Sequence, residues 1–428
     1  MNRKQFLQQV TSFIRSKPAQ KHVEKELEQH ITHAKKAWMD KGYQEEAAEA
    51  LAIQHMGSPM TLGQELGKVH KPKVDWLMIG LVTLLLAFSF LPLLAVMHEE
   101  HKIVGFNSIF WRNALHIGFA IIVLVCLMLF DVQKLENKGF IFYGIAIGFL
   151  LWLHFFSGYV SAGQKVIVIG AYKLNAWYTL PFFCIAWAAL FLKHTVKLWQ
   201  VILLVGTGFI LIASTGSTSV LLVFSVMTFV MLLQGYFERK QKIVFAISAV
   251  VAIILFVLFI AFNVLGGIIK PYQLGRVIGF LNPEKYPTTE GYIYLYVKGI
   301  IDNAKWFGAI ESTFFLNGHT DFVFVQLIKS YGYVFAFIVA LLLFVLIVQM
   351  GKHCIKQSQS FAKLLVIGAS TLFATQVLYS LGMSIGMLPI MAVPLPFITY
   401  GFMPTLINAC LVGLVLSVYR RKSYIFSS

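Results

Sequence analysis

Carboxylates are scarce in most of this 428-residue chain, and their positions limit where proton-transfer chemistry can take place. Only ten follow residue 75; five of these lie from Glu284 to Asp321, and none occurs in the last 107 residues. Asp321 stands in the segment NGHTDFVF, directly after His319 and Thr320, which could orient it. A half-buried carboxylate in this setting suits general base catalysis on a hydroxyl group. Aspartate is also a favoured helix N-cap, so a purely structural role is an equal alternative.

The elements that must position these residues are strongly apolar. Hydrophobic residues make up 58% of the chain and charged residues only 13%, with a mean hydropathy of +0.74. A soluble fold of this size needs a more polar surface, so lipid must solvate much of the protein. We predict an all-α polytopic membrane protein with about ten transmembrane helices. The expected spans are 76–97, 112–131, 139–157, 177–193, 199–214, 216–235, 243–264, 321–349, 362–386 and 402–419.

The basic residues predict how these spans are oriented. Short connecting segments rich in Lys and Arg, such as DVQKLENK and YFERKQK, alternate with segments that lack this enrichment. The positive-inside rule places the basic segments, and both chain termini, in the cytosol. Membrane orientation therefore explains the net charge of +16 better than binding to nucleic acid. We expect a multi-pass protein of the cytoplasmic membrane, with a large outer loop over 265–320 that carries function.

The absence of acids within the predicted spans disfavours one class of function. Ion-coupled transporters usually hold ionisable groups at mid-membrane depth. Here only His116 and His154 are candidates, and lone histidines on apolar helices are more often packed and neutral. A proton-coupled pump is therefore disfavoured.

Residues 1–72 predict a small cytosolic helical domain, separate from a membrane domain over 73–428. Two amphipathic stretches within it end at Gly42 and Gly57, and three or four short helices are expected. The segment resembles the prefix domain of some bacterial permeases, which implies an adaptor or regulatory module. A helical hairpin that aids insertion or stability is an equal alternative.

Several motifs resemble those of the shape, elongation, division and sporulation (SEDS) family. HTDFVF is similar to the family's HTDF signature, and PLPFITYG (394–401) is similar to its PLPFISYGG. The likeness covers roughly residues 76–422 and adds weaker matches in the expected order. These are Trp111-Arg112-Asn113, RVIGFLNP (276–283), Gly291-Tyr292 and GMLP (386–389).

The resemblance implies a peptidoglycan glycosyltransferase that polymerises lipid II at the outer face of a bacterial cytoplasmic membrane, in division, shape or sporulation. It implies Asp321 as the general base, with Arg276 and Arg112 facing the diphosphate leaving group. Snorkelling to lipid headgroups is an equal alternative for these two arginines. The other implied substrate contacts are His319, Thr320, Tyr292, Pro396, Thr399 and Tyr400.

The partners implied by the resemblance are lipid II, membrane lipids and a single-span class B transpeptidase. No metal-ligand cluster is visible, and no cofactor is implied with certainty; a divalent cation is an open alternative. PLPFITYG is expected to form a wall of the substrate groove, with a Pro-capped helix start as the alternative.

Departures from the family pattern keep two other hypotheses open. Leu316-Asn317 and Lys329-Ser330 replace a Pro-Glu and a Glu-Glu pair on either side of HTDF. Ser214-Thr215-Gly216-Ser217 replaces an Asp-Leu-Gly-Thr turn. The chain could therefore be a non-catalytic protein of the same fold that regulates or scaffolds a cell-wall synthase. A transporter of the lipid-linked precursor is the third hypothesis.

Overall fold

A computed structural model describes residues 1–14, 17–69, 73–99, 106–161, 163–192, 196–247, 279–310, 318–355 and 361–421. The chain forms two compact units. The first consists of Met1–Asp75 with the C-terminal segment from Val418, and the second, the membrane unit, of Trp76–Ser417.

The described part of the first unit is helical, with α1 (Arg3–Ser12), α2 (Lys17–Met39), α3 (Glu45–His55) and α4 (Pro59–Val69). Each helix buries an apolar stripe in a shared core built on side chains such as Phe6, Val10 and Ile31. The chain turns with positive φ at Gly42 (+94°) and Gly57 (+82°), the two stops that the sequence predicts. Glycine adopts this conformation without steric cost, so both helices can end sharply.

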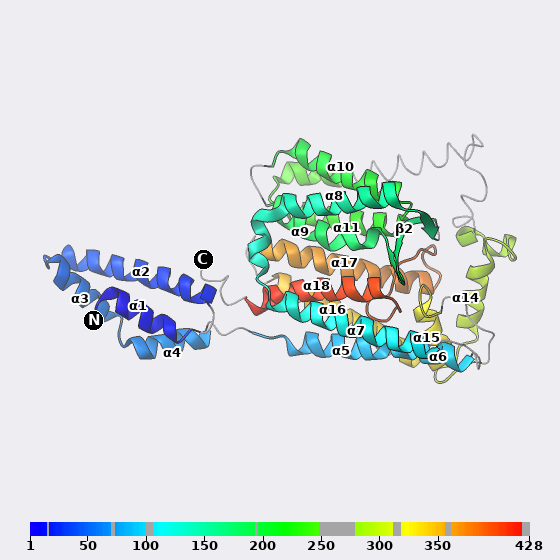
Figure 1. Ribbon diagram of the computed structural model, residues 1–428, viewed down its shortest axis with the longest axis horizontal. Helices are drawn as coiled ribbons and strands as arrows, with labels where there is room; N and C mark the ends of the chain where they lie inside the picture. Colours follow the sequence, from blue (N-terminus) through cyan, green and yellow to red (C-terminus); the bar gives the residue numbers. More distant parts are fainter. Residues whose placement is uncertain are drawn as a thin grey trace. The chain divides into compact units, whose positions relative to one another are not determined.

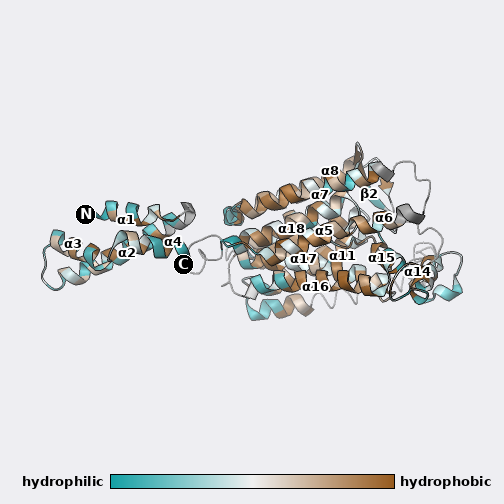
Figure 2. Ribbon diagram, turned by 90° about the horizontal axis from the view of Figure 1, so that it is seen from below, coloured by the Kyte–Doolittle hydropathy of each residue, from teal (hydrophilic) through white to brown (hydrophobic). Residues whose placement is uncertain are grey.

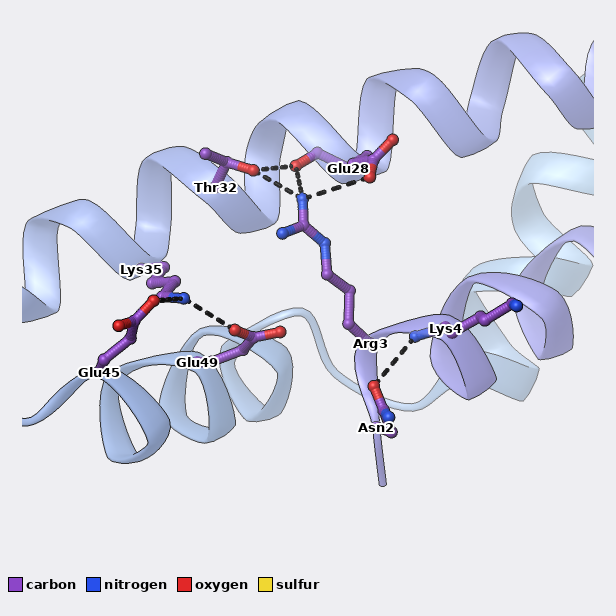
Figure 3. A network of polar contacts seen from close by, with 8 residues as sticks. All are labelled: Asn2, Arg3, Lys4, Glu28, Thr32, Lys35, Glu45 and Glu49. Atoms are coloured by element: carbon purple, nitrogen blue, oxygen red, sulfur yellow. Dashed lines mark hydrogen bonds and ion pairs between the residues drawn. The ribbon is translucent and has the colours of Figure 1, made fainter.

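Polar contacts on the surface join α2 to its neighbours (Figure 3). Lys35 Nζ donates to Glu45 Oε1 at 2.8 Å and to Glu49 Oε2 at 2.9 Å, which links α2 to α3. Arg3 donates to the Glu28 carbonyl at 2.7 Å and to Thr32 Oγ1 at 2.6 Å, which links α1 to α2. Exposed pairs of this kind contribute little to stability. The apolar core is therefore the main support of this unit.

The membrane unit is a bundle of apolar helices. The helices that coincide with predicted spans are α5 (Trp76–Phe88) with α6 (Phe90–Glu99), α7 (Phe106–Leu129), α8 (Gly139–Phe156), α9 (Leu180–Leu190), α10 (Leu198–Ser214), α11 (Thr218–Gln234), α16 (Tyr333–Ile355), α17 (Phe361–Ser384) and α18 (Phe402–Arg420). Within the described residues, six stretches are long and apolar enough to cross a membrane, and α9, α10 and α11 are shorter apolar helices. The predicted polytopic helical fold is confirmed. The expected span 243–264 lies largely outside the described residues.

Burial separates the central helices from those that face lipid. In the most apolar 18-residue stretch of α17 and of α18, 61% and 72% of the residues are buried, against 22% in α7. α17 packs against α9, α11 and α16, so it forms the middle of the bundle (Figure 1). Figure 2 shows largely brown, apolar ribbon along these helices. Helices of this composition fit a bundle that is solvated by lipid.

A small antiparallel sheet, absent from the sequence prediction, closes one end of the bundle. It has the order β1 (Tyr159–Ser161), β2 (Gln164–Ile169) and β3 (Tyr172–Leu174), with turns at Gly163 and Gly170. The Lys165 N–H donates to the Thr215 carbonyl at 2.8 Å, in the turn between α10 and α11. The predicted tight turn at Ser214–Gly216 is therefore present, and the sheet is attached to it.

The predicted eighth span, 321–349, is wrong as a single helix. The chain forms a nine-residue helix, α15 (Val323–Tyr331), and breaks at Gly332 with φ +86° before α16 begins at Tyr333. A Cβ at Gly332 would lie 2.6 Å from the Trp306 carbonyl oxygen, so a larger residue cannot fit here. The membrane span therefore begins at Tyr333 rather than at Asp321, and α15 belongs to the segment that precedes it.

The described part of the predicted outer loop is also ordered around α15. Within it, the short 3-10 helix η3 (Pro283–Lys285) precedes α14 (Tyr292–Asp302), which packs on α15. Two other 3-10 helices, η1 (Val132–Lys138) and η2 (Ala176–Thr179), precede α8 and α9. Val297 and Ile300 of α14 contact Phe322 and Val325. Figure 1 shows α14, α15 and the sheet at the same end of the bundle, which we call the site end.

We expect Gly332→Ala to destabilise the protein by about 2 kcal/mol, because alanine is strained at positive φ and its Cβ would clash with a carbonyl. Gly351→Ala is the matched control within α16, since nothing lies within 4 Å of a Cβ there. The thermal unfolding midpoint in nanodiscs should fall for Gly332→Ala and stay level or rise for Gly351→Ala. Equal midpoints for both variants would contradict the described break.

Candidate functional site

Asp321 lies in a turn at the site end, just before α15. The N-cap position of α15 is held by Phe322, whose side chain makes no cap hydrogen bond, and Asp321 precedes it by one residue. The carboxylate is half-buried and stands next to the positive end of the helix dipole.

The two most specific sequence motifs meet at this turn. The Tyr400 N–H donates to the His319 carbonyl at 3.0 Å. The Thr399 hydroxyl makes a longer contact, 3.5 Å, to the Thr320 carbonyl, 79 residues away in sequence. The structure therefore places PLPFITYG directly against the segment that carries Asp321.

PLPFITYG is irregular, as expected from its prolines, and it is not the start of α18. Its residues from Pro394 to Thr399 are buried, and Phe397 adopts a left-handed conformation (φ +64°) that is uncommon for a non-glycine residue. The Thr399 hydroxyl accepts from the Leu395 N–H at 2.8 Å. Pro396 and Thr399 therefore shape the backbone from inside, whereas Tyr400 is half-exposed.

Tyr400 belongs to a group of rings drawn from four segments, which we call the ring cluster: His116, Tyr172, His319, Tyr400 and Phe402. The Tyr400 ring lies 5.8 Å from the His319 ring and 5.9 Å from the His116 ring. His116 is 6% exposed, and both of its nitrogens lack a hydrogen-bond partner among the described residues. The two candidate residues His319 and Tyr400 are thus in contact, and sequence reasoning missed Tyr172 and Phe402.

Burial sets the protonation of the polar rings outside the spans. It lowers the pKa of His319, so the neutral imidazole is favoured at neutral pH. It also raises the pKa of Tyr400, an effect that the charge of Arg112 opposes and Tyr172 reinforces. Both rings are therefore neutral hydrogen-bonding groups.

Arg112 reaches this region from α7, one turn before His116. Its guanidinium donates to the Ser108 carbonyl at 3.2 Å and to the Ser108 hydroxyl at 3.1 Å, and the side chain is exposed. Because His116 belongs to the ring cluster, Arg112 lies one helical turn from that cluster. An exposed arginine can bind an anionic group.

Two other predicted substrate residues lie apart or cannot be placed. Tyr292 is exposed on α14 and stacks on Tyr296, with ring centroids 5.9 Å apart. Tyr294, on the same helix, accepts from the Ile390 N–H at 3.1 Å, so α14 is joined to the GMLP segment. Arg276 lies outside the described residues.

The second histidine considered for ion coupling, His154, is paired at the end of α8. Its Nδ1 lies 3.0 Å from Ser214 Oγ and 3.2 Å from Lys165 Nζ. Lysine only donates, so Nδ1 must accept. Among the described residues, no group of three His, Cys, Asp or Glu side chains forms a metal site.

Comparison with known proteins identifies the family. The family model for FtsW, RodA and SpoVE cell cycle proteins matches residues 75–424. The chain belongs to this family, the SEDS proteins. The resemblance inferred from HTDFVF and PLPFITYG is thereby confirmed, and residues before 75 lie outside the match.

Curated SEDS relatives match over part of their length. The probable peptidoglycan glycosyltransferase FtsW of Aliivibrio salmonicida is 30% identical over 172 residues, which are 36% of this chain and 43% of that protein. The protein of the same name from Enterococcus hirae is 29% identical over 137 residues, 32% of this chain and 34% of the relative. These matches span less than half of each relative.

Solved structures share the SEDS fold over most of the membrane unit. One, of a peptidoglycan synthase complex that coordinates polymerization and crosslinking, has a TM-score of 0.66 at 20% identity, covering 82% of this chain and 98% of its own. The rod shape determining protein RodA of Thermus thermophilus has a TM-score of 0.57 at 18% identity, covering 81% and 97%. At these identities the likeness shows the fold.

We expect Thr399→Val to destabilise the protein by about 1–3 kcal/mol, because it leaves the buried Leu395 N–H without its acceptor. Thr83→Val is the control, since the exposed Thr83 hydroxyl bonds only to its own helix at Ile79. The thermal unfolding midpoint in nanodiscs should fall for the first variant and change little for the second. A Thr399→Val midpoint equal to wild type would show that this bond does not hold PLPFITYG.

Proposed function

We propose that this SEDS protein is a peptidoglycan glycosyltransferase that polymerises lipid II, with Asp321 as the general base. The observation that carries the proposal is the contact between PLPFITYG and the Asp321 turn, next to the ring cluster. The names of the curated relatives support the same reaction. The half-buried carboxylate, the neutral rings and a nearby cation supply the groups that the reaction needs.

In the proposed reaction, two lipid-linked precursors meet at the site end. The 4-hydroxyl of the acceptor sugar attacks the anomeric carbon of the donor, and Asp321 takes the hydroxyl proton. The glycosidic bond forms as the bond from the anomeric carbon to the diphosphate oxygen breaks. The polyprenyl diphosphate leaves with the bonding electron pair, so its charge increases.

The leaving group needs cationic partners, and Arg112 is exposed one helical turn before His116 of the ring cluster. Arg276 is proposed as a second cation from its sequence position alone. His319, Thr320 and Tyr400 are proposed to contact the sugars, while buried Pro396 and Thr399 hold the wall that presents Tyr400. Tyr292 is proposed to meet substrate from α14.

The surroundings of the reaction are proposed from charge and fold. The basic connecting segments favour a site end that faces outward, with both termini cytosolic. The proposed domains are the helical residues 1–72 and the membrane domain 73–428. A single-span class B transpeptidase is the proposed protein partner, which the fold likeness to a peptidoglycan synthase complex supports.

One observation favours the alternative of a non-catalytic scaffold. Lys329 replaces a family glutamate in the last turn of α15 and is only 1% exposed, so a buried lysine stands in the helix that follows the proposed base. A changed charge in this shell could abolish catalysis while the fold still binds lipid II. An ion-coupled transporter of the precursor is less favoured, because the described spans hold no acid at mid-depth.

We expect Asp321→Asn to lower lipid II polymerisation by about 100-fold or more, because the amide cannot accept the hydroxyl proton. Asp302→Asn, an exposed acid at the end of α14, is the matched control and should keep wild-type activity. The measurement is glycan formation from lipid II by purified protein in liposomes, with and without a class B transpeptidase. If wild-type protein binds lipid II but forms no glycan under either condition, the glycosyltransferase hypothesis is contradicted and the non-catalytic scaffold is favoured.

A further inference from the structure

Two adjacent aromatic side chains project from the connection between α14 and α15. Trp306 and Phe307 are each 73% exposed, which is unusual for such large apolar groups. They follow an exposed lysine, Lys305. None of the three belongs to the motifs or the ring cluster that support the proposed reaction.

Hydrogen bonds fix this segment, which we call the aromatic tip (305–307), to the first turn of a membrane span. The Tyr333 N–H donates to the Lys305 carbonyl at 3.0 Å, and the Val334 N–H donates to the Trp306 carbonyl at 3.2 Å. The Trp306 ring lies 5.9 Å from the Tyr333 ring. Tyr333 is the first residue of the span Tyr333–His353, so the aromatic tip lies at the level where that span begins.

The face of α16 below the aromatic tip is exposed and apolar. Tyr333, Phe337, Leu341 and Phe344 follow helical spacing, so they share one face of α16. Phe337, Leu341 and Phe344 are exposed, as expected for side chains that contact acyl chains. Trp306 therefore lies at the head of an exposed apolar stripe.

The other highly exposed tryptophans of the described residues occupy similar positions. Trp76 is the first residue of a span, Trp111 lies in the first turn of another, and Trp199 is the second residue of α10. Tryptophan gathers at the boundary between headgroups and hydrocarbon, because its ring is apolar and its N–H can bond to polar groups. Trp306 adds such a group from a loop.

We propose that the aromatic tip is a lipid anchor in the leaflet at the site end. The Phe307 ring contacts acyl chains, the Trp306 N–H bonds to ester or phosphate oxygens, and the Lys305 ammonium pairs with phosphates. Because the same residues cap α16 and follow α14, the anchor sets the depth of the α15 turn, and with it Asp321, against the bilayer. This role does not depend on the proposed reaction.

The test uses the full chain with fluorine-labelled tryptophan in nanodiscs, observed by fluorine NMR. Trp306→Phe assigns the Trp306 resonance and keeps an aromatic ring; Trp306→Tyr is the second assignment variant. A lipid with a nitroxide near its headgroup should remove most of the Trp306 intensity, as it should for Trp199. Trp187, which is fully buried in the bundle, should keep its intensity.

Two outcomes would overturn the anchor. A Trp306 resonance that keeps its intensity with the nitroxide lipid, but loses it with a water-soluble gadolinium chelate, would place the aromatic tip in solvent. A resonance that neither agent affects would mean that protein covers the tip, either a second copy of the chain or a partner.

Discussion

Backbone groups that leave a helix beside a membrane must find partners within the protein, and this constraint determines the site end. Three irregular segments meet it by bonding to one another or to neighbouring helices. Tyr400 donates to the His319 carbonyl, Ile390 to the Tyr294 hydroxyl, and Tyr333 to the Lys305 carbonyl. Each bond joins parts that are distant in sequence. The hydrogen bond from the Tyr400 N–H to the His319 carbonyl therefore holds the turn that contains Asp321.

This mutual support explains how a bundle of apolar helices can present a polar site. The central helices α17 and α18 carry the packing, so the segments between them and the other spans are free to be irregular. Those segments bring a carboxylate and two neutral rings to one end, and α7 adds an arginine. Changes in the surrounding shell, such as buried Lys329, can then alter chemistry without altering the fold. Family membership and catalytic activity are therefore separate questions here.

The sequence predicted the apolar spans and the family better than the local structure. Apolar runs of membrane length are a strong signal, and HTDFVF with PLPFITYG led to the family. The break at Gly332 was missed because FVFVQLI and YVFAF are apolar on both sides of it, although a glycine after a short helix was a visible stop. The sheet and the place of Tyr172 depend on tertiary contacts with α7 and α18, which no local pattern records.

The most direct measurement is a cryo-EM structure of the full chain in nanodiscs with bound lipid II. The proposed function predicts sugar density within hydrogen-bond distance of the Asp321 carboxylate, with the diphosphate toward Arg112. Density for the precursor at another place on the protein, or on the opposite side of the membrane from Asp321, would contradict it.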